Sequence, residues 1–310
     1  MKTITSVEEF VERVRTAAAA WPVEQPRWFR GEPNVDTRLL PSLYRMPNGA
    51  ELENRLLQTF RSRAAAFSTD PLPDRKHTDK WLFLAQHVGI PTRLLDWSEG
   101  ALIGLYFALK SERPIVWMLN PLYLNHFATA SRGERNELRE FPLPWFNPVQ
   151  RGRNMANENM RGAWERDAVG IEVPMAIHPT YVHHRLRAQH SCFTVHGKRK
   201  ASLDLMVSGD MLKRFEVDPE SRPSIQRDLA TLGVTESVAY PDLDGLARDL
   251  VDRFCRAPVI NGDSRPVRLW KRNISGKVPS TASSGQKRVT AHKAGRVHRR
   301  IPGRRMTQGG

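Results

Sequence analysis

The apolar positions along the chain predict several amphipathic helices separated by short strand-like runs. Residues 49–67 and 243–254 each carry an apolar stripe with the three- to four-residue spacing of a helix that buries one face. A helix is also predicted from Ser6 to about Ala20, because the run from Ser6 to Glu9 has the form of a capping box. Another helix, over 223–232, is expected to end at Gly233.

Short apolar or alternating runs predict the strands. They lie at 27–31, 114–120, 168–177, 192–196 and 237–240. The mixture predicts an α+β fold with a compact mixed sheet flanked by helices. We expect an N-terminal helix in residues 1–25, a main domain in 26–257 with an insertion at about 121–165, and a tail in 258–310.

The central stretch, residues 81–109, places polar side chains inside apolar sequence. Two helix-like segments flank a break at Gly89 and Pro91. Buried polar groups require partners, because leaving one unpaired costs about 1–3 kcal/mol. Arg93 and Asp96 would share a face of a helical turn and pair with each other or with a ligand. This spacing is compatible with a functional site and also with a buried polar cluster that only stabilises the core.

The positive charge of the chain is concentrated at its C-terminal end. The net charge is +15, but residues 264–310 hold 13 of the 48 Lys and Arg residues and no Asp or Glu. The preceding part therefore has 35 basic and 33 acidic residues, a charge of only +2. With few apolar residues to bury, the tail is predicted to be disordered and to offer an electrostatic contact to DNA or RNA.

The remaining composition excludes several classes of protein. Cys192 and Cys255 are too few for a disulfide framework. No apolar run approaches the roughly 20 residues that span a bilayer, and acidic residues interrupt the N-terminal region where a signal peptide would lie. We therefore expect a cytoplasmic protein that does not bind membranes. Histidines are frequent between 178 and 196, but without paired-ligand spacing no metal site is predicted.

Two arginines and one glutamate need partners. Arg30 follows an aromatic pair at a strand end and suits a bidentate contact with phosphate or carboxylate, or an ion pair with Glu32 or Asp36. Glu53 lies beside the apolar stripe of its helix. It would either face solvent or meet Arg30 or Arg93 inside the domain.

Three sequence boxes resemble those of the FRG-domain family. They are Trp28-Phe29-Arg30-Gly31, the block from Gln86 to Trp97, and a weaker match at 187–194, where Ser191 replaces the more usual glycine. The resemblance covers roughly residues 26–254 and implies more about fold than about chemistry.

The order of these boxes is also similar to that of ADP-ribosyltransferases, which use NAD. This resemblance implies an NAD-binding set and a catalytic set. The NAD-binding set is Arg30, Gly31, Gln86, Thr92 and Arg93. The catalytic set is His87, Asp96 and Gln189, with Thr194 as an alternative to Gln189 and Glu53 as an alternative to Asp96. His190 follows Gln189 where a late glutamate is usual.

The resemblance implies an NAD-dependent ADP-ribosyltransferase-like effector, of the toxin or phage-defence type, that modifies nucleic acid or protein. The main alternative is a non-catalytic nucleic-acid-binding or regulatory module. A nuclease that uses Asp96, Glu53 and His87 is a third reading, although the sequence shows no paired acidic motif for magnesium.

Overall fold

The computed structural model describes residues 2–32, 37–68, 71–74, 78–130, 174–178, 191–197, 200–207 and 209–255. The chain divides into two compact units, Met1–Pro258 and Val259–Gly310, and all described residues belong to the first. The predicted tail, most of the predicted insertion and Gln189 lie outside the described residues.

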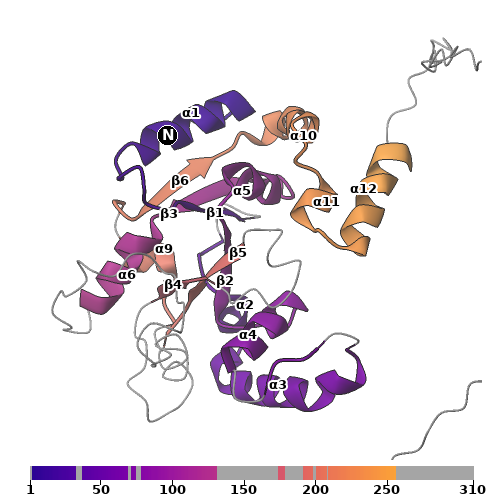
Figure 1. Ribbon diagram of the computed structural model, residues 1–310. Coiled ribbons are helices and arrows are strands. Elements are labelled where there is room, and N and C mark those ends of the chain that lie inside the picture. Colours follow the sequence, from indigo (N-terminus) through magenta and orange to yellow (C-terminus); the bar gives the residue numbers. More distant parts are fainter. Residues whose placement is uncertain are drawn as a thin grey trace, which may run out of the picture. The chain divides into compact units, whose positions relative to one another are not determined.

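The described residues form an α+β fold around a six-stranded sheet, as predicted (Figure 1). The strands are β1 (Trp28–Glu32), β2 (Leu94–Ser98), β3 (Ile115–Leu119), β4 (Met175–Ile177), β5 (Ser191–Val195) and β6 (Leu212–Glu216). The helices are α1 (Val7–Ala18), α2 (Ser42–Arg45), α3 (Gly49–Arg63), α4 (Thr78–His87), α5 (Ala101–Ala108), α6 (Pro121–Ala130), α9 (Leu203–Met206), α10 (Arg222–Thr231), α11 (Glu236–Ala239) and α12 (Leu243–Cys255).

The sheet has the order β4-β5-β2-β1-β3-β6, and its strands pair antiparallel. An isolated parallel bridge joins Ile4 to Val217. Most neighbouring strands pair along three to five residues, whereas β1 and β2 pair at a single position, Phe29 with Ser98. The sheet therefore consists of two three-stranded halves that part beyond this pair.

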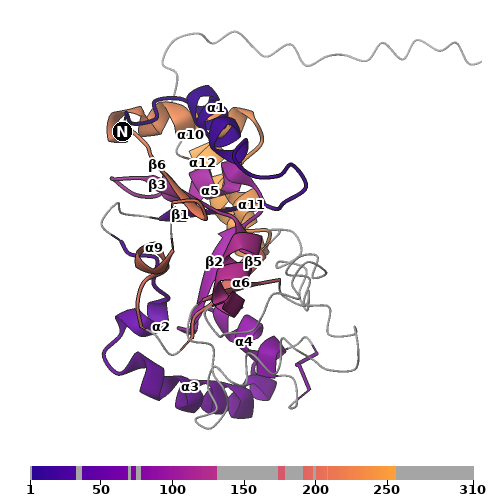
Figure 2. The same ribbon diagram turned by 90° about the vertical axis from the view of Figure 1, so that its left-hand side faces the viewer.

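Apolar side chains cover both faces of the sheet. On one face, α1, α5 and α10 pack on β1, β3 and β6, while α3 and α4 pack on β2, β4 and β5 (Figures 1 and 2). The opposite face carries Trp28, Leu95 and Trp97, which pack with residues of α6 and α9. The first face thus has two separate groups of covering helices.

Local signals explain several element ends. Ser6 Oγ accepts a hydrogen bond from the Glu9 amide at 3.1 Å, while the Glu9 carboxylate accepts from the Thr5 amide at 2.9 Å, so the predicted cap is present with its return bond shifted by one residue. Gly233 follows α10 with φ of 83°, the left-handed conformation expected of a terminating glycine.

Two of the predicted elements differ from the structure. The segment predicted as a strand at 237–240 belongs to helix α11 and its C-terminal cap. Residues 94–98, read as part of a helical turn, form strand β2. Leu94, Asp96 and Ser98 consequently face one side of the sheet and Leu95 and Trp97 the other, because side chains alternate along a strand.

Candidate functional site

A cavity of about 420 Å³ lies on the sheet face between the two helix groups, where β1 and β2 part. The described residues that line it are Phe29, Arg30, Gly31, Gln86, His87, Asp96, Trp97, Ser98, Ile103, Phe107, Lys110, Ser191, Phe193 and Tyr240. Its volume falls within the range of small-molecule sites. Five of the predicted site residues therefore line one cavity: Arg30, Gly31, Gln86, His87 and Asp96.

The Arg30 side chain bridges the parting strands. Its Nη1 donates to the Asp96 carbonyl oxygen at 2.7 Å and lies 3.8 Å from Asp96 Oδ2. Its Nε donates to Glu32 Oε1 at 2.5 Å, so the predicted ion pair with Glu32 is present. The guanidinium thus links β1 to β2 in addition to their single paired position and lies at the cavity wall.

Asp96 presents its carboxylate to the cavity. Its side chain is 55% exposed, although it lies in a concave wall surrounded by protein atoms. Gln86 Nε2 donates to Asp96 Oδ2 at 2.7 Å. The loss of water around the carboxylate raises the pKa of Asp96, and the Arg30 charge and the Gln86 hydrogen bond oppose that rise. Asp96 is therefore the titratable anion of the cavity wall.

Gln86 and His87 reach the cavity because α4 ends beside it. His87 is the last residue of the helix, and Gly89, with φ of 85°, turns the chain away. Thr92 does not line the cavity. Its hydroxyl donates to Gln86 Oε1 and accepts from the Leu94 amide at 3.0 Å, so it orients Gln86 toward Asp96.

Arg93 lies outside the cavity lining, contrary to the expected pairing with Asp96 or with a ligand. It precedes strand β2, where positions three apart point to opposite faces. Its guanidinium is buried and binds the buried Glu53 carboxylate, with Nε 2.8 Å from each oxygen. Burial disfavours the charge, but the hydrogen bond and charge of Glu53 outweigh that effect and raise the pKa of Arg93. Glu53 therefore meets Arg93, one of its two predicted partners, rather than solvent.

Gly31 lines the cavity and is also required for the packing of helix α5 on strand β1. A Cβ atom at this position would lie within 3.0 Å of the backbone of Gly104 and Ala108 in α5. Helix α5 can therefore approach β1 this closely only because residue 31 has no side chain.

A comparison with protein-family models matches the segment that carries most of these residues. Residues 25–115 match the FRG domain. No curated protein and no solved structure matches the chain. The FRG match contains strand β1, helices α4 and α5 and strand β2, and hence Arg30, His87 and Asp96.

The cavity also contains residues beyond the FRG match. Ser191 and Phe193 come from β5, and Tyr240 follows α11. Thr194, predicted as an alternative catalytic residue, is buried and accepts a hydrogen bond from Trp97 Nε1 at 3.1 Å, which indicates a structural role. The FRG segment thus supplies the polar centre, and later elements complete the wall.

Sequence reasoning missed the contribution of α5. Ile103, Phe107 and Lys110 line the cavity and recur with spacings of four and three, which places them on one helical stripe. The core-facing residues of this helix, which include Leu105 and Leu109, form a different stripe. The second stripe, which ends in a lysine, was the available signal.

The described residues contain neither a group of three or more His, Cys, Asp or Glu side chains able to hold a metal ion nor a helix of the length and apolarity that a bilayer crossing requires. The cavity offers a carboxylate, an imidazole, two cationic side chains and several aromatic rings. This set suits a ligand that combines phosphate with rings, and it places proton-transfer groups at the same wall.

Proposed function

We propose that the FRG-domain cavity binds NAD and that the chain is an ADP-ribosyltransferase-like effector of the toxin or phage-defence type, acting on nucleic acid or protein. The observation that carries the proposal is the meeting of Arg30, His87 and Asp96, from three separate elements, in one open cavity. The size of the cavity and its aromatic walls support a nucleotide ligand.

Each polar group has a role in the proposed reaction. The bond between ribose C1′ and the nicotinamide nitrogen breaks, and its electron pair leaves with nicotinamide. Positive charge develops on the ribose, where the ionised Asp96 carboxylate stabilises it. A nucleophilic atom of the acceptor forms the new bond to C1′, and its proton passes to the His87 ring. Gln86 fixes Asp96, and Arg30 holds the backbone beside it.

The experiment that tests this proposal measures nicotinamide release by the full chain. Purified protein is incubated with NAD, free nicotinamide is quantified by chromatography, and candidate protein, DNA and RNA acceptors are examined by mass spectrometry for ADP-ribose. Asp96→Asn is expected to lower the rate by about 10²–10³-fold, the typical cost of one electrostatic contact to a transition state.

Asp228→Asn is the matched control, because Asp228 is exposed on α10 and does not line the cavity. It should release nicotinamide at the wild-type rate. A folded wild-type protein that neither binds nor cleaves NAD would refute the proposal, as would full activity of Asp96→Asn.

The hydrogen bonds of the site also support a second candidate, a non-catalytic binding module. Asp96 and Arg30 already have protein partners, and this arrangement equally suits a polar cluster with a purely structural role. In that case a nucleotide would bind without release of nicotinamide. Under either function we propose that residues 264–310 contact DNA or RNA through their Lys and Arg side chains.

A further inference from the structure

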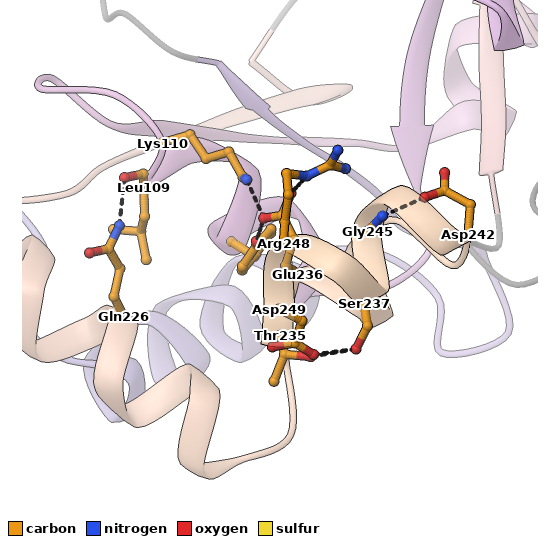
Figure 3. A network of polar contacts seen from close by, with 11 residues as sticks. Leu109, Lys110, Gln226, Thr235, Glu236, Ser237, Asp242, Gly245, Arg248 and Asp249 are labelled. Atoms are coloured by element: carbon orange, nitrogen blue, oxygen red, sulfur yellow. Dashed lines mark hydrogen bonds and ion pairs between the residues drawn. The ribbon is translucent and has the colours of Figure 1, made fainter. Parts of the chain in front are cut away.

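The short helix pair α11–α12 is attached to α5 through the carboxylate of Glu236 (Figure 3). Glu236 accepts hydrogen bonds from Tyr106 Oη, from Lys110 Nζ at 2.5 Å and from Arg248 Nε at 2.8 Å. Burial alone would raise the pKa of Glu236, but these donors outweigh burial and lower it to about 2. The carboxylate is thus ionised at neutral pH and joins α5 to both later helices.

This attachment places Tyr240 in the cavity wall. Tyr240 caps the end of α11, and its ring lies edge-on to Phe107 of α5, with centroids 5.5 Å apart. Both rings line the cavity. The aromatic wall therefore depends on an element far beyond the FRG match.

Lys110 is held at the same edge by three contacts. Its Nζ lies 5.0 Å from the Tyr106 ring centroid and 5.2 Å from that of Tyr240, in addition to the bond with Glu236. These contacts fix the position of a flexible side chain and reduce the entropy that ligand binding would otherwise cost. An ammonium group has three donors, and among the described residues only Glu236 accepts a hydrogen bond from it.

The described lining residues include two cations, Arg30 and Lys110, which differ in the number of protein carboxylates that lie beside them. Arg30 lies beside both Glu32 and Asp96, and its side chain is 16% exposed. Among the described residues, Glu236 is the one carboxylate paired with Lys110, which shares it with Arg248, and the Lys110 side chain is 39% exposed. Arg248 also interacts with Asp242 and Asp244. Of the two lining cations, Lys110 therefore has the greater capacity for an added anion.

We propose that Lys110, held by Glu236 and the two tyrosine rings, is the phosphate-binding residue of the cavity and orients its ligand. The phosphates lie toward α5 and α11. The other end of the ligand reaches Asp96, whose carboxylate would stabilise positive charge on the ribose. This inference rests on the proposed function for the identity of the ligand as a nucleotide. It reassigns to Lys110 the phosphate contact expected of Arg30 and Arg93.

The test is calorimetric titration of the full chain with ADP-ribose, ADP and adenosine, which differ in phosphate content. Lys110→Met is expected to weaken ADP-ribose and ADP binding by about 10- to 100-fold, the effect of one charge-assisted hydrogen bond. Adenosine affinity should change by less than about twofold. Lys110→Arg keeps the charge and should retain most of the affinity.

Lys200→Met is the matched control, because Lys200 forms an exposed ion pair with Glu51 and does not line the cavity. It should bind all three ligands as the wild type does. Equal ADP-ribose affinity in Lys110→Met and wild type overturns the inference, as does an equal loss of adenosine and ADP-ribose. Wild-type binding of ADP-ribose without NAD cleavage would overturn the proposed catalysis alone, whereas failure to bind any of the three overturns both.

Discussion

The buried pair of Arg93 and Glu53 gives the sharpest stability prediction. Arg93→Met removes the cation and leaves the Glu53 carboxylate buried without its counter-charge. Breaking such a pair from one side typically costs about 3–5 kcal/mol. Replacing both residues, as Arg93→Met with Glu53→Met, removes the desolvated charge altogether and should recover most or all of that loss.

Urea denaturation measures these differences. With an m value of about 3 kcal/mol/M, the unfolding midpoint of Arg93→Met should fall by about 1–1.7 M. Lys200→Met serves again as the control, because its ion pair with Glu51 is exposed on both sides and such pairs contribute about 0–1 kcal/mol.

Ligand binding separates this interpretation from the earlier expectation that Arg93 holds the ligand. The double variant should bind ADP-ribose with near wild-type affinity. If Arg93→Met unfolds at the wild-type urea concentration but loses ADP-ribose binding, Arg93 contacts the ligand and the structural reasoning is wrong.

Other predictions concern packing, pH and the tail. Gly31→Ala should destabilise the chain by at least about 1–3 kcal/mol, because the new methyl group would meet the backbone of helix α5. Gly209→Ala is the control: no atom lies within 4 Å of its Cβ position, so its melting temperature should differ little from that of the wild type. The stability that Glu236 contributes should be complete above its ordinary pKa of 4.5 and disappear as the pH falls toward 2, so the melting temperatures of wild type and Glu236→Gln should converge over that interval; a constant difference would contradict the lowered pKa. Nicotinamide release should decline on acidification at a pH above the ordinary Asp96 value of 3.8, because protonation removes the required anion; an unchanged rate through that range would exclude this role. Truncation after Asp263 should abolish salt-sensitive binding to a DNA or RNA oligonucleotide and leave ADP-ribose binding intact; retained oligonucleotide binding would place that contact elsewhere.

Sequence patterns predicted the elements whose signals are local. The cap of α1 depends on Ser6 and Glu9, and the end of α10 depends on Gly233, so a few neighbouring residues determine each. Helix α12 and strand β1 were likewise found from their apolar periodicity. These features need no knowledge of distant contacts.

The errors occurred where tertiary pairing decides the conformation. Residues 94–98 carry an apolar run that suits a helix or a buried strand, and pairing with β5 selects the strand. That choice separates Arg93 from Asp96 and gives Arg93 a partner 40 residues earlier in the chain. No local spacing reveals such a partner.

The candidate site was predicted in part for the same reason. Arg30, His87 and Asp96 stood out because they are polar groups within apolar boxes. Lys110 and Tyr240 lie outside these boxes: the helical spacing from Ile103 was the available signal for Lys110, and an isolated tyrosine such as Tyr240 is a common surface feature. Their place in the cavity follows from the packing of α11 against α5.

A crystal structure of the full chain with ADP-ribose would show whether the cavity binds this ligand and in which orientation. We expect ligand density in the cavity between β1, α4 and α5, with the diphosphate beside Lys110 and the terminal ribose toward Asp96. Density at another surface, or an empty cavity at saturating ligand, would contradict it.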